Sequence, residues 1–142
     1  MSATAGPSES RRSATGKLGL TTGQVVQELG WDEDVDDELR IGIEDAIDGE
    51  LVEEAMDAVD AVLLWWRDDD GDLVDGLVDA VVDLSATGVL WLLTPKVGRS
   101  GYVDNADISE AAVTAGLSLT NSANVSPDWA AHKLVRPRGS RR

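Results

Sequence analysis

Residues 59–95, "VDAVLLWWRDDDGDLVDGLVDAVVDLSATGVLWLLTP", contain two apolar runs on either side of an amphipathic pattern. The runs at 59–66 and 89–94 are short and almost continuously apolar, which is typical of strands buried on both faces of a sheet. Between them, apolar residues recur at helical spacing over 72–84, with aspartates on the opposite face. A strand, a helix and a second strand in this order predict a right-handed crossover between parallel strands, and so an α/β fold.

The segments on either side extend this alternation. Upstream, residues 25–29 fit either a strand or a short helix, because so short a run has no decisive period. The helix predicted next, over 34–48, has apolar residues on one face and acids on the other. Downstream, Asp107 and Glu110 have the spacing of a capping box at a helix start, and Gly116 has the character of its C-terminal stop.

The end of the chain predicts a hairpin. Residues 117–125 alternate in polarity, "SPD" at 126–128 forms a turn, and residues 129–135 form a last strand. Strands joined by so short a turn pair antiparallel. We therefore expect one three-layer, Rossmann-like α/β domain of about five strands, mostly parallel with an antiparallel C-terminal hairpin, over residues 17–137.

The two ends of the chain are expected to lie outside this domain. Residues 1–16 are small, polar and aperiodic, which predicts a disordered tail, and residues 138–142 predict a short basic tail. No apolar stretch follows the two N-terminal arginines, so this is not the pattern of a secretory signal. No apolar run approaches the length that spans a bilayer. These patterns favour a cytoplasmic protein without a membrane partner.

Charge and composition narrow the function further. The net charge is -15, and Arg40 and Arg67 are the only bases within the acid-rich residues 24–83. Such a surface repels phosphates, so nucleic acid is not expected as a partner. The chain has no cysteine, which excludes disulfides, thiolate metal sites and cysteine nucleophiles.

Gly30 raises the question of a cofactor, since it follows the possible first strand. A dinucleotide turn needs several glycines to bring backbone amides to the pyrophosphate. This chain instead has Trp31 and then three acids, which disfavour NAD, FAD and nucleoside triphosphates. S-adenosylmethionine carries no phosphate, so the acids alone do not exclude it, but the missing glycines argue against it. An acidic helix start is favoured, and no cofactor is expected.

Neither a metal site nor a catalytic residue is expected. "RDDDGD" at 67–72 resembles part of a calcium loop, but Trp66 stands where the first ligand belongs. His132 is the only histidine, so it has no histidine or cysteine partner for a metal. Ser122 and Asp128 are near it in sequence, but catalysis would need a fixed nucleophile and orienter. A structural or surface role is favoured.

The best place for a ligand is the loop after residues 89–94. Ligands of open α/β sheets bind beyond the carboxyl ends of the strands, and this loop holds two glycines and local bases. A flexible, solvated loop is the alternative. Together with the turn at Gly30, the candidate ligand site comprises Gly30, Trp31, Arg67, Thr94, Lys96, Arg99 and Tyr102.

Four strings carry a family resemblance: "LGLTTGQVVQELGWDEDVDDELR", "DAVLLWWR", "LWLLTPKVGRSGYVDNADISEAA" and "NVSPDWAAHKLV". From Leu18 to Pro137 the chain resembles a small acidic actinobacterial family known as domain of unknown function 3052. It is more distantly similar to the sheet of Rossmann-like methyltransferases, which implies the strand order 1-2-3-5-4 with only the last strand antiparallel. Two early strands and the glycine pattern of that fold are missing here.

Three functions agree with these observations. The leading one is a non-catalytic module that binds a protein with a basic patch through its acidic surface. The second is a small-molecule binder or a degenerate methyltransferase-like enzyme, with its site at the carboxyl ends of the strands. The third is an accessory subunit of an enzyme complex. The predicted partner surface is the acidic face of the helix over 72–84, formed by Asp72, Asp75, Asp79 and Asp83.

Overall fold

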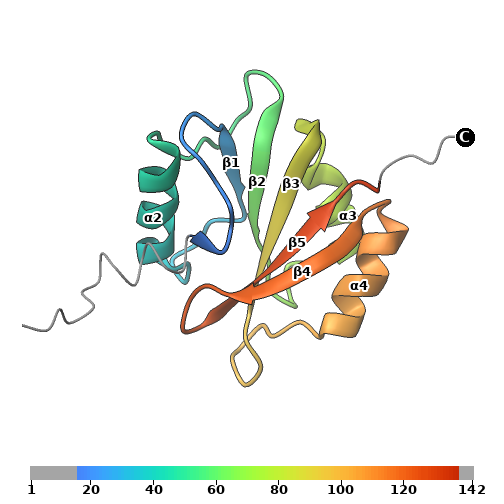
Figure 1. Cartoon of the computed structure of the whole chain (residues 1–142). Coiled ribbons are helices and arrows are strands. Elements are labelled where there is room, and N and C mark those ends of the chain that lie inside the picture. Colours follow the sequence, from blue (N-terminus) through green and yellow to red (C-terminus); the bar gives the residue numbers. More distant parts are fainter. Residues whose placement is uncertain (1–15, 138–142) are drawn as a thin grey trace, which may run out of the picture.

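The computed structural model describes residues 16–137, which form one open sheet with helices on both faces. The strands have the expected order β1-β2-β3-β5-β4. β1, β2 and β3 are parallel, and β5 is antiparallel to both of its neighbours (Figure 1). The prediction of a mostly parallel sheet with a C-terminal antiparallel hairpin is confirmed. The strands are β1 (Val26–Leu29), β2 (Val59–Trp65), β3 (Leu84–Pro95), β4 (Ser118–Asn124) and β5 (Trp129–Val135).

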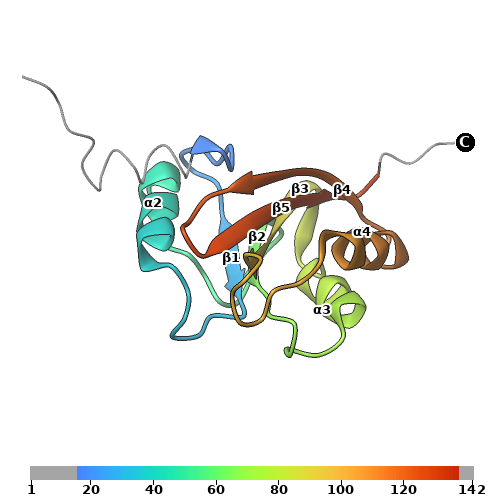
Figure 2. The same cartoon turned by 90° about the horizontal axis from the view of Figure 1, so that it is seen from below.

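The helices complete a three-layer arrangement. α2 (Asp37–Ile47) lies on one face of the sheet, and α3 (Leu73–Ala80) and α4 (Asn105–Thr114) lie together on the other (Figure 2). Two apolar clusters follow from this, one between α2 and the sheet and one between the sheet and the helix pair. Leu77, one of the apolar residues at helical spacing in 72–84, is fully buried in the second cluster.

Two helices begin elsewhere than predicted. α2 starts after Asp36, whose carboxylate accepts a hydrogen bond from the Leu39 amide, so the expected start at residue 34 is wrong. α4 is capped by Asp104, which accepts from the Ala106 amide at 2.9 Å, so the expected capping box at Asp107 is wrong as well. Neighbouring aspartates have equal capping chemistry, and the path of the preceding loop decides which of them is used.

α3 and β3 divide residues 72–95 differently from the prediction. Asp72 caps α3, but the helix ends at Ala80 rather than at residue 84. β3 begins at Leu84, five residues before the apolar run that predicted it. The first residues of this long strand are partly exposed and include polar side chains. They therefore lack the continuous apolar run that is typical of a strand buried on both faces.

The outer side of β1 is partly covered. Residues 25–29, which fitted either a strand or a helix, contain strand β1. Val52 bridges to Gln27 and exchanges backbone hydrogen bonds with β1. This contact occupies part of an edge that would otherwise expose unpaired amides.

The expected tails fall almost wholly outside the described residues, since only Gly16 of the two segments lies within them. Among residues 16–137, no helix has the length and apolar character needed to cross a membrane.

Candidate functional site

The turn after β1 depends on Gly30. Its φ is 77°, in the left-handed region that favours glycine. A Cβ atom at this position would lie 2.2 Å from the carbonyl oxygen of Trp65. Gly30 therefore lets the end of β1 approach the end of β2, and its place in the sequence has a packing reason that requires no cofactor.

Arg67 closes this turn from the β2 side. Its Nη1 donates to the Gly30 carbonyl at 2.8 Å, and its Nε donates to Asp34 at 3.0 Å. Asp70 and the ring of Trp129, whose centroid is 5.2 Å from the guanidinium carbon, complete the surroundings. Burial opposes the charge, yet the two carboxylates outweigh it and raise the pKa of Arg67. The hydrogen bond to Arg67 lowers the pKa of Asp34.

A second ion pair, between Glu28 and Arg40, joins the end of β1 to α2. Glu28 is 96% buried at its side chain and accepts two hydrogen bonds from Arg40, at 2.7 and 2.8 Å. It also accepts from the indole nitrogen of Trp65 at 2.9 Å. The hydrogen bond to Glu28 raises the pKa of Arg40. The Glu28 carboxylate thus accepts all three hydrogen bonds, which link α2 to β1 and β2.

Trp65 and Trp129 join the two groups. Their rings meet edge to face at 4.9 Å, and the Trp129 indole donates to the Asp34 carbonyl at 3.2 Å. Residues from β1, α2, β2 and β5 thus form one continuous set of contacts at the ends of the strands. We call it the strand-end network: Glu28, Asp34, Arg40, Trp65, Arg67 and Trp129.

A hollow of about 420 Å³ lies beside this network, between the turn after β1 and α3. Its lining includes Gly30, Trp31 and Arg67, so the structure brings together three of the seven candidate ligand residues. Trp31 is 53% exposed, and Trp66 forms another part of the wall. The hollow is lined by both apolar rings and carboxylates, among them those of Asp70 and Asp79.

The other four candidate residues lie elsewhere. Thr94 is buried and hydrogen-bonded to His132. The loop after β3 holds Lys96, Arg99 and Tyr102 at the surface, and Arg99 forms an ion pair with Asp128 at 2.6 Å. The backbone of this loop reaches the Arg67 region, where the Gly101 carbonyl accepts from the Asp68 amide at 2.9 Å.

His132 is a buried residue with two hydroxyl partners. Ser122 Oγ lies 2.9 Å from its Nδ1, and Thr94 Oγ1 lies 3.1 Å from its Nε2. Burial lowers the pKa of His132, which favours the neutral ring with one donor and one acceptor nitrogen. These contacts link β3, β4 and β5, in agreement with the structural role that the sequence favoured. Within residues 16–137, no group of three or more potential ligand side chains could hold a metal ion.

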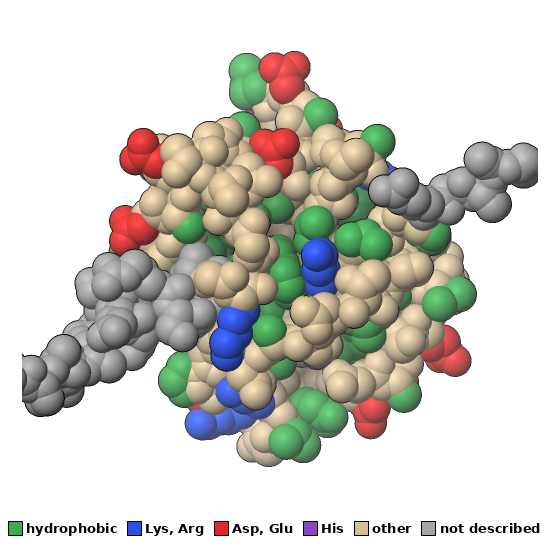
Figure 3. Space-filling model, in the orientation of Figure 1, with side chains coloured by type: hydrophobic (Ala, Val, Ile, Leu, Met, Phe, Trp, Pro, Cys, Tyr) green, Lys and Arg blue, Asp and Glu red, His purple; other side chains and the backbone are tan. Residues whose placement is uncertain are grey.

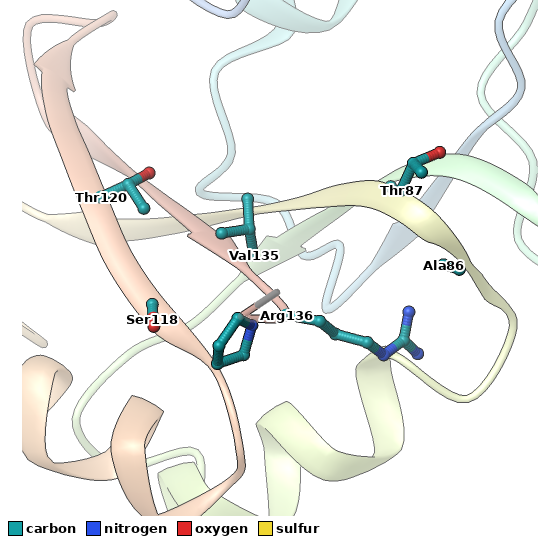
Figure 4. A pocket seen from close by; sticks show the side chains of 8 residues that line it. Ala86, Thr87, Ser118, Thr120, Val135 and Arg136 are labelled. Atoms are coloured by element: carbon teal, nitrogen blue, oxygen red, sulfur yellow. The ribbon is translucent and has the colours of Figure 1, made fainter. Parts of the chain in front are cut away.

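A larger hollow, of about 760 Å³, lies at the opposite end of the sheet, near the start of β3 (Figure 4). Hydroxyl groups of Thr87, Ser118 and Thr120 line part of it. Arg136 also lines it, but its guanidinium donates to the carbonyls of Val81, Leu84 and Ser85. This guanidinium therefore links the segment after β5 to the turn after α3.

The network contains residues that sequence reasoning did not select. Glu28 is a single acid within a buried strand, and Arg40 is a single base within an acidic helix. Buried ionisable groups are usually paired with a group of opposite charge. The single acid in the strand and the single base in the helix could therefore have been predicted to form an ion pair. Asp34, Trp65 and Trp129 gave no comparable signal, because acids and apolar residues surround them in the sequence.

Several solved structures with a similar fold are methyltransferases. The chain superposes on the mitomycin 7-O-methyltransferase MmcR with a TM-score of 0.59 at 11% identity, covering 90% of this chain and 54% of that one. A SAM-dependent methyltransferase from Aquifex aeolicus gives 0.57 at 11% identity, covering 87% and 88%. The pyocyanin biosynthetic protein PhzM gives 0.63 at 11% identity, covering 90% and 55%. The chain spans about half the length of MmcR and PhzM, and at this identity the likeness concerns the fold alone.

Closer similarity is found in mycobacteria. Uncharacterized proteins of Mycobacterium tuberculosis and Mycobacterium bovis are each 54% identical over 123 residues, which cover 86% of this chain and 77% of each relative. A family model described as "Protein of unknown function (DUF3052)" matches residues 15–138. The match spans the whole described domain, and the chain therefore belongs to the DUF3052 family.

Proposed function

We propose that this protein is a non-catalytic module of methyltransferase-like fold that binds another protein through the acidic surface of α3. The observation that carries the proposal is the position of Arg67. In open α/β sheets, ligands bind beyond the carboxyl ends of the strands. At that place, Arg67 bonds to the Gly30 carbonyl and to Asp34, so a side chain of the protein itself occupies the turn.

The residues of this turn do not fit S-adenosylmethionine. Gly30 is followed by the indole of Trp31 rather than by further glycines, and its carbonyl is already an acceptor for Arg67. We therefore assign no methyl-transfer step to these residues.

The acidic surface lies on the outer side of α3. Asp72, Asp75, Asp79 and Asp83 are all exposed, and Asp72 also caps the helix. Asp75 and Asp79 are four residues apart on one helix, where like charges destabilise by about 0.2–0.5 kcal/mol. The face over the β4–β5 hairpin differs, since most of its side chains are uncharged (Figure 3). Four exposed carboxylates thus lie on and next to α3, which favours a basic partner there.

A small-molecule binder is the second candidate function. The hollow of about 420 Å³ beside Trp31 favours it, because its volume falls within the usual range of ligand sites, about 300–1,000 Å³. A ligand there would contact indole rings and carboxylates, so its chemistry would be aromatic or cationic rather than anionic.

The variant Asp75→Asn/Asp79→Asn tests the proposed surface. We expect it to capture less of the proteins that the wild type retains from native lysate, and to keep or slightly raise the melting temperature. Wild-type capture should also fall steeply as salt rises from about 50 to about 300 mM, because the Debye length shortens. Quantitative mass spectrometry of the retained proteins measures both effects.

The control variant, Glu54→Gln/Asp57→Asn, removes the same charge from exposed positions before β2. It should retain the wild-type set of proteins. Equal retention by the α3 variant and the wild type at each salt concentration would show that this helix face is only a solubilising surface.

A further inference from the structure

The hollow beside α3 has two indole rings in its wall. Trp31 is half exposed although tryptophan is strongly apolar. The Trp66 ring is held against α3 at Gly76, where an added Cβ atom would lie 2.5 Å from Cζ3 of the ring. A glycine inside a helix costs about 0.5–1 kcal/mol relative to alanine. The close contact with Trp66 is a physical reason for that glycine.

Carboxylates border the same hollow. Asp32 and Asp70 lie in the turns after β1 and β2, and Asp79 projects from α3. The Asp70 carboxylate accepts from the Arg67 amide at 2.9 Å. The Asp79 carboxylate is exposed, and within the described part of the chain it has no ion-pair partner. Indole faces and carboxylates in one hollow attract a cation that also has a flat surface.

The protein holds one of its own arginines, which also lines this hollow, in this way. The Arg67 guanidinium lies over the Trp129 ring at 5.2 Å and pairs with Asp34. A planar guanidinium can stack flat on an indole while its fork of N–H donors binds a carboxylate, whereas the ammonium of lysine is a compact point charge with no flat face. The same two kinds of group line the empty space beside Trp31.

We propose that this hollow receives an arginine side chain of the basic partner, stacked on Trp31 and paired with Asp79. The inference rests on the proposed function, because it assigns to that partner the residue that enters beside the acidic surface. Arg67 also lines the hollow, but its charge is already paired with Asp34 and Asp70. An anionic ligand would therefore meet the carboxylates of Asp32 and Asp79, and a metal ion would gain nothing from the indole rings.

Two peptides of equal charge, deca-arginine and deca-lysine, test the inference against the full-length protein. We expect calorimetry to show that the wild type binds the arginine peptide about 3–10-fold more tightly, as cation–π contacts of this size predict. Trp31→Ala should reduce that preference to about the ratio expected from charge alone, without loss of lysine binding. The matched control is Val78→Ala, which truncates an exposed apolar side chain on α3 that does not line the hollow. It should leave the preference unchanged.

The outcomes separate this inference from the proposed function. If Trp31→Ala keeps the wild-type preference for arginine, the hollow is not the arginine site. Asp75→Asn/Asp79→Asn should weaken both peptides whether or not the hollow is used. If neither peptide binds the wild type in a salt-dependent way, the acidic surface fails as a partner site and the inference falls with it. Circular dichroism of each variant verifies that the fold is retained.

Discussion

Replacing Glu28 with alanine is expected to lower the free energy of unfolding by about 3–5 kcal/mol, the usual loss when one partner of a buried ion pair is removed. The carboxylate is almost completely buried and accepts three hydrogen bonds, two from Arg40 and one from Trp65. Without it, a partly buried guanidinium and a buried indole N–H lose their acceptor. The penalty comes from those unpaired donors more than from the lost attraction.

Asp37 provides the matched control, because it pairs with the same Arg40 but is 74% exposed. Asp37→Asn should change the free energy of unfolding by less than about 1 kcal/mol, as is usual for exposed ion pairs. Urea denaturation of both variants gives the comparison. Similar losses in the two variants would contradict the description of Glu28 as the buried centre that joins α2 to the sheet.

Gly30→Ala is the second change with a large expected effect, about 2–5 kcal/mol. A left-handed φ in a residue with a side chain costs on the order of 1–3 kcal/mol. The clash with the Trp65 carbonyl adds a comparable amount, since it can be relieved only by moving the backbone of β1 or β2. Thermal and chemical denaturation of the variant measure the loss.

Gly116→Ala separates the two contributions. Gly116 has a similar φ of 83°, but an added Cβ atom would meet no atom within 4 Å. Gly116→Ala should therefore lose only the free energy that the left-handed φ costs a residue with a side chain. The difference in unfolding free energy between the two variants measures the cost of the clash at Gly30. If Gly30→Ala is no worse than Gly116→Ala, the close approach of the two strand ends does not explain this glycine.

The sequence was sufficient for the sheet and insufficient for the contacts at its end. The apolar runs of β2 and β3 predicted their strands because buried parallel strands need apolar residues on both faces. Helix starts were less certain, since Asp34, Asp36 and Asp37 all have a side chain that can cap. The same ambiguity displaced the cap of α4.

The strand-end network could not be read from spacing. Glu28 and Trp65 are 37 residues apart, and Asp34 and Trp129 are 95 apart, so only the folded chain brings them together. Gly30 shows the difference most clearly. In the sequence it has the position of a cofactor turn that lacks its other glycines, whereas in the structure it is the place where two strand ends meet. Trp31 and Arg67, which were selected from the sequence, flank that turn in the structure. The residues that contact them come from distant elements and were not selected.

Calorimetric titration of the full-length protein with S-adenosylmethionine tests the central claim most directly, that the turn after β1 is occupied by Arg67 and holds no such cofactor. At about millimolar ligand we predict no saturable heat, which corresponds to a binding free energy weaker than about -4 kcal/mol. A dissociation constant in the low micromolar range would contradict the account, because the ligand would then have to displace Arg67 from Gly30 and Asp34.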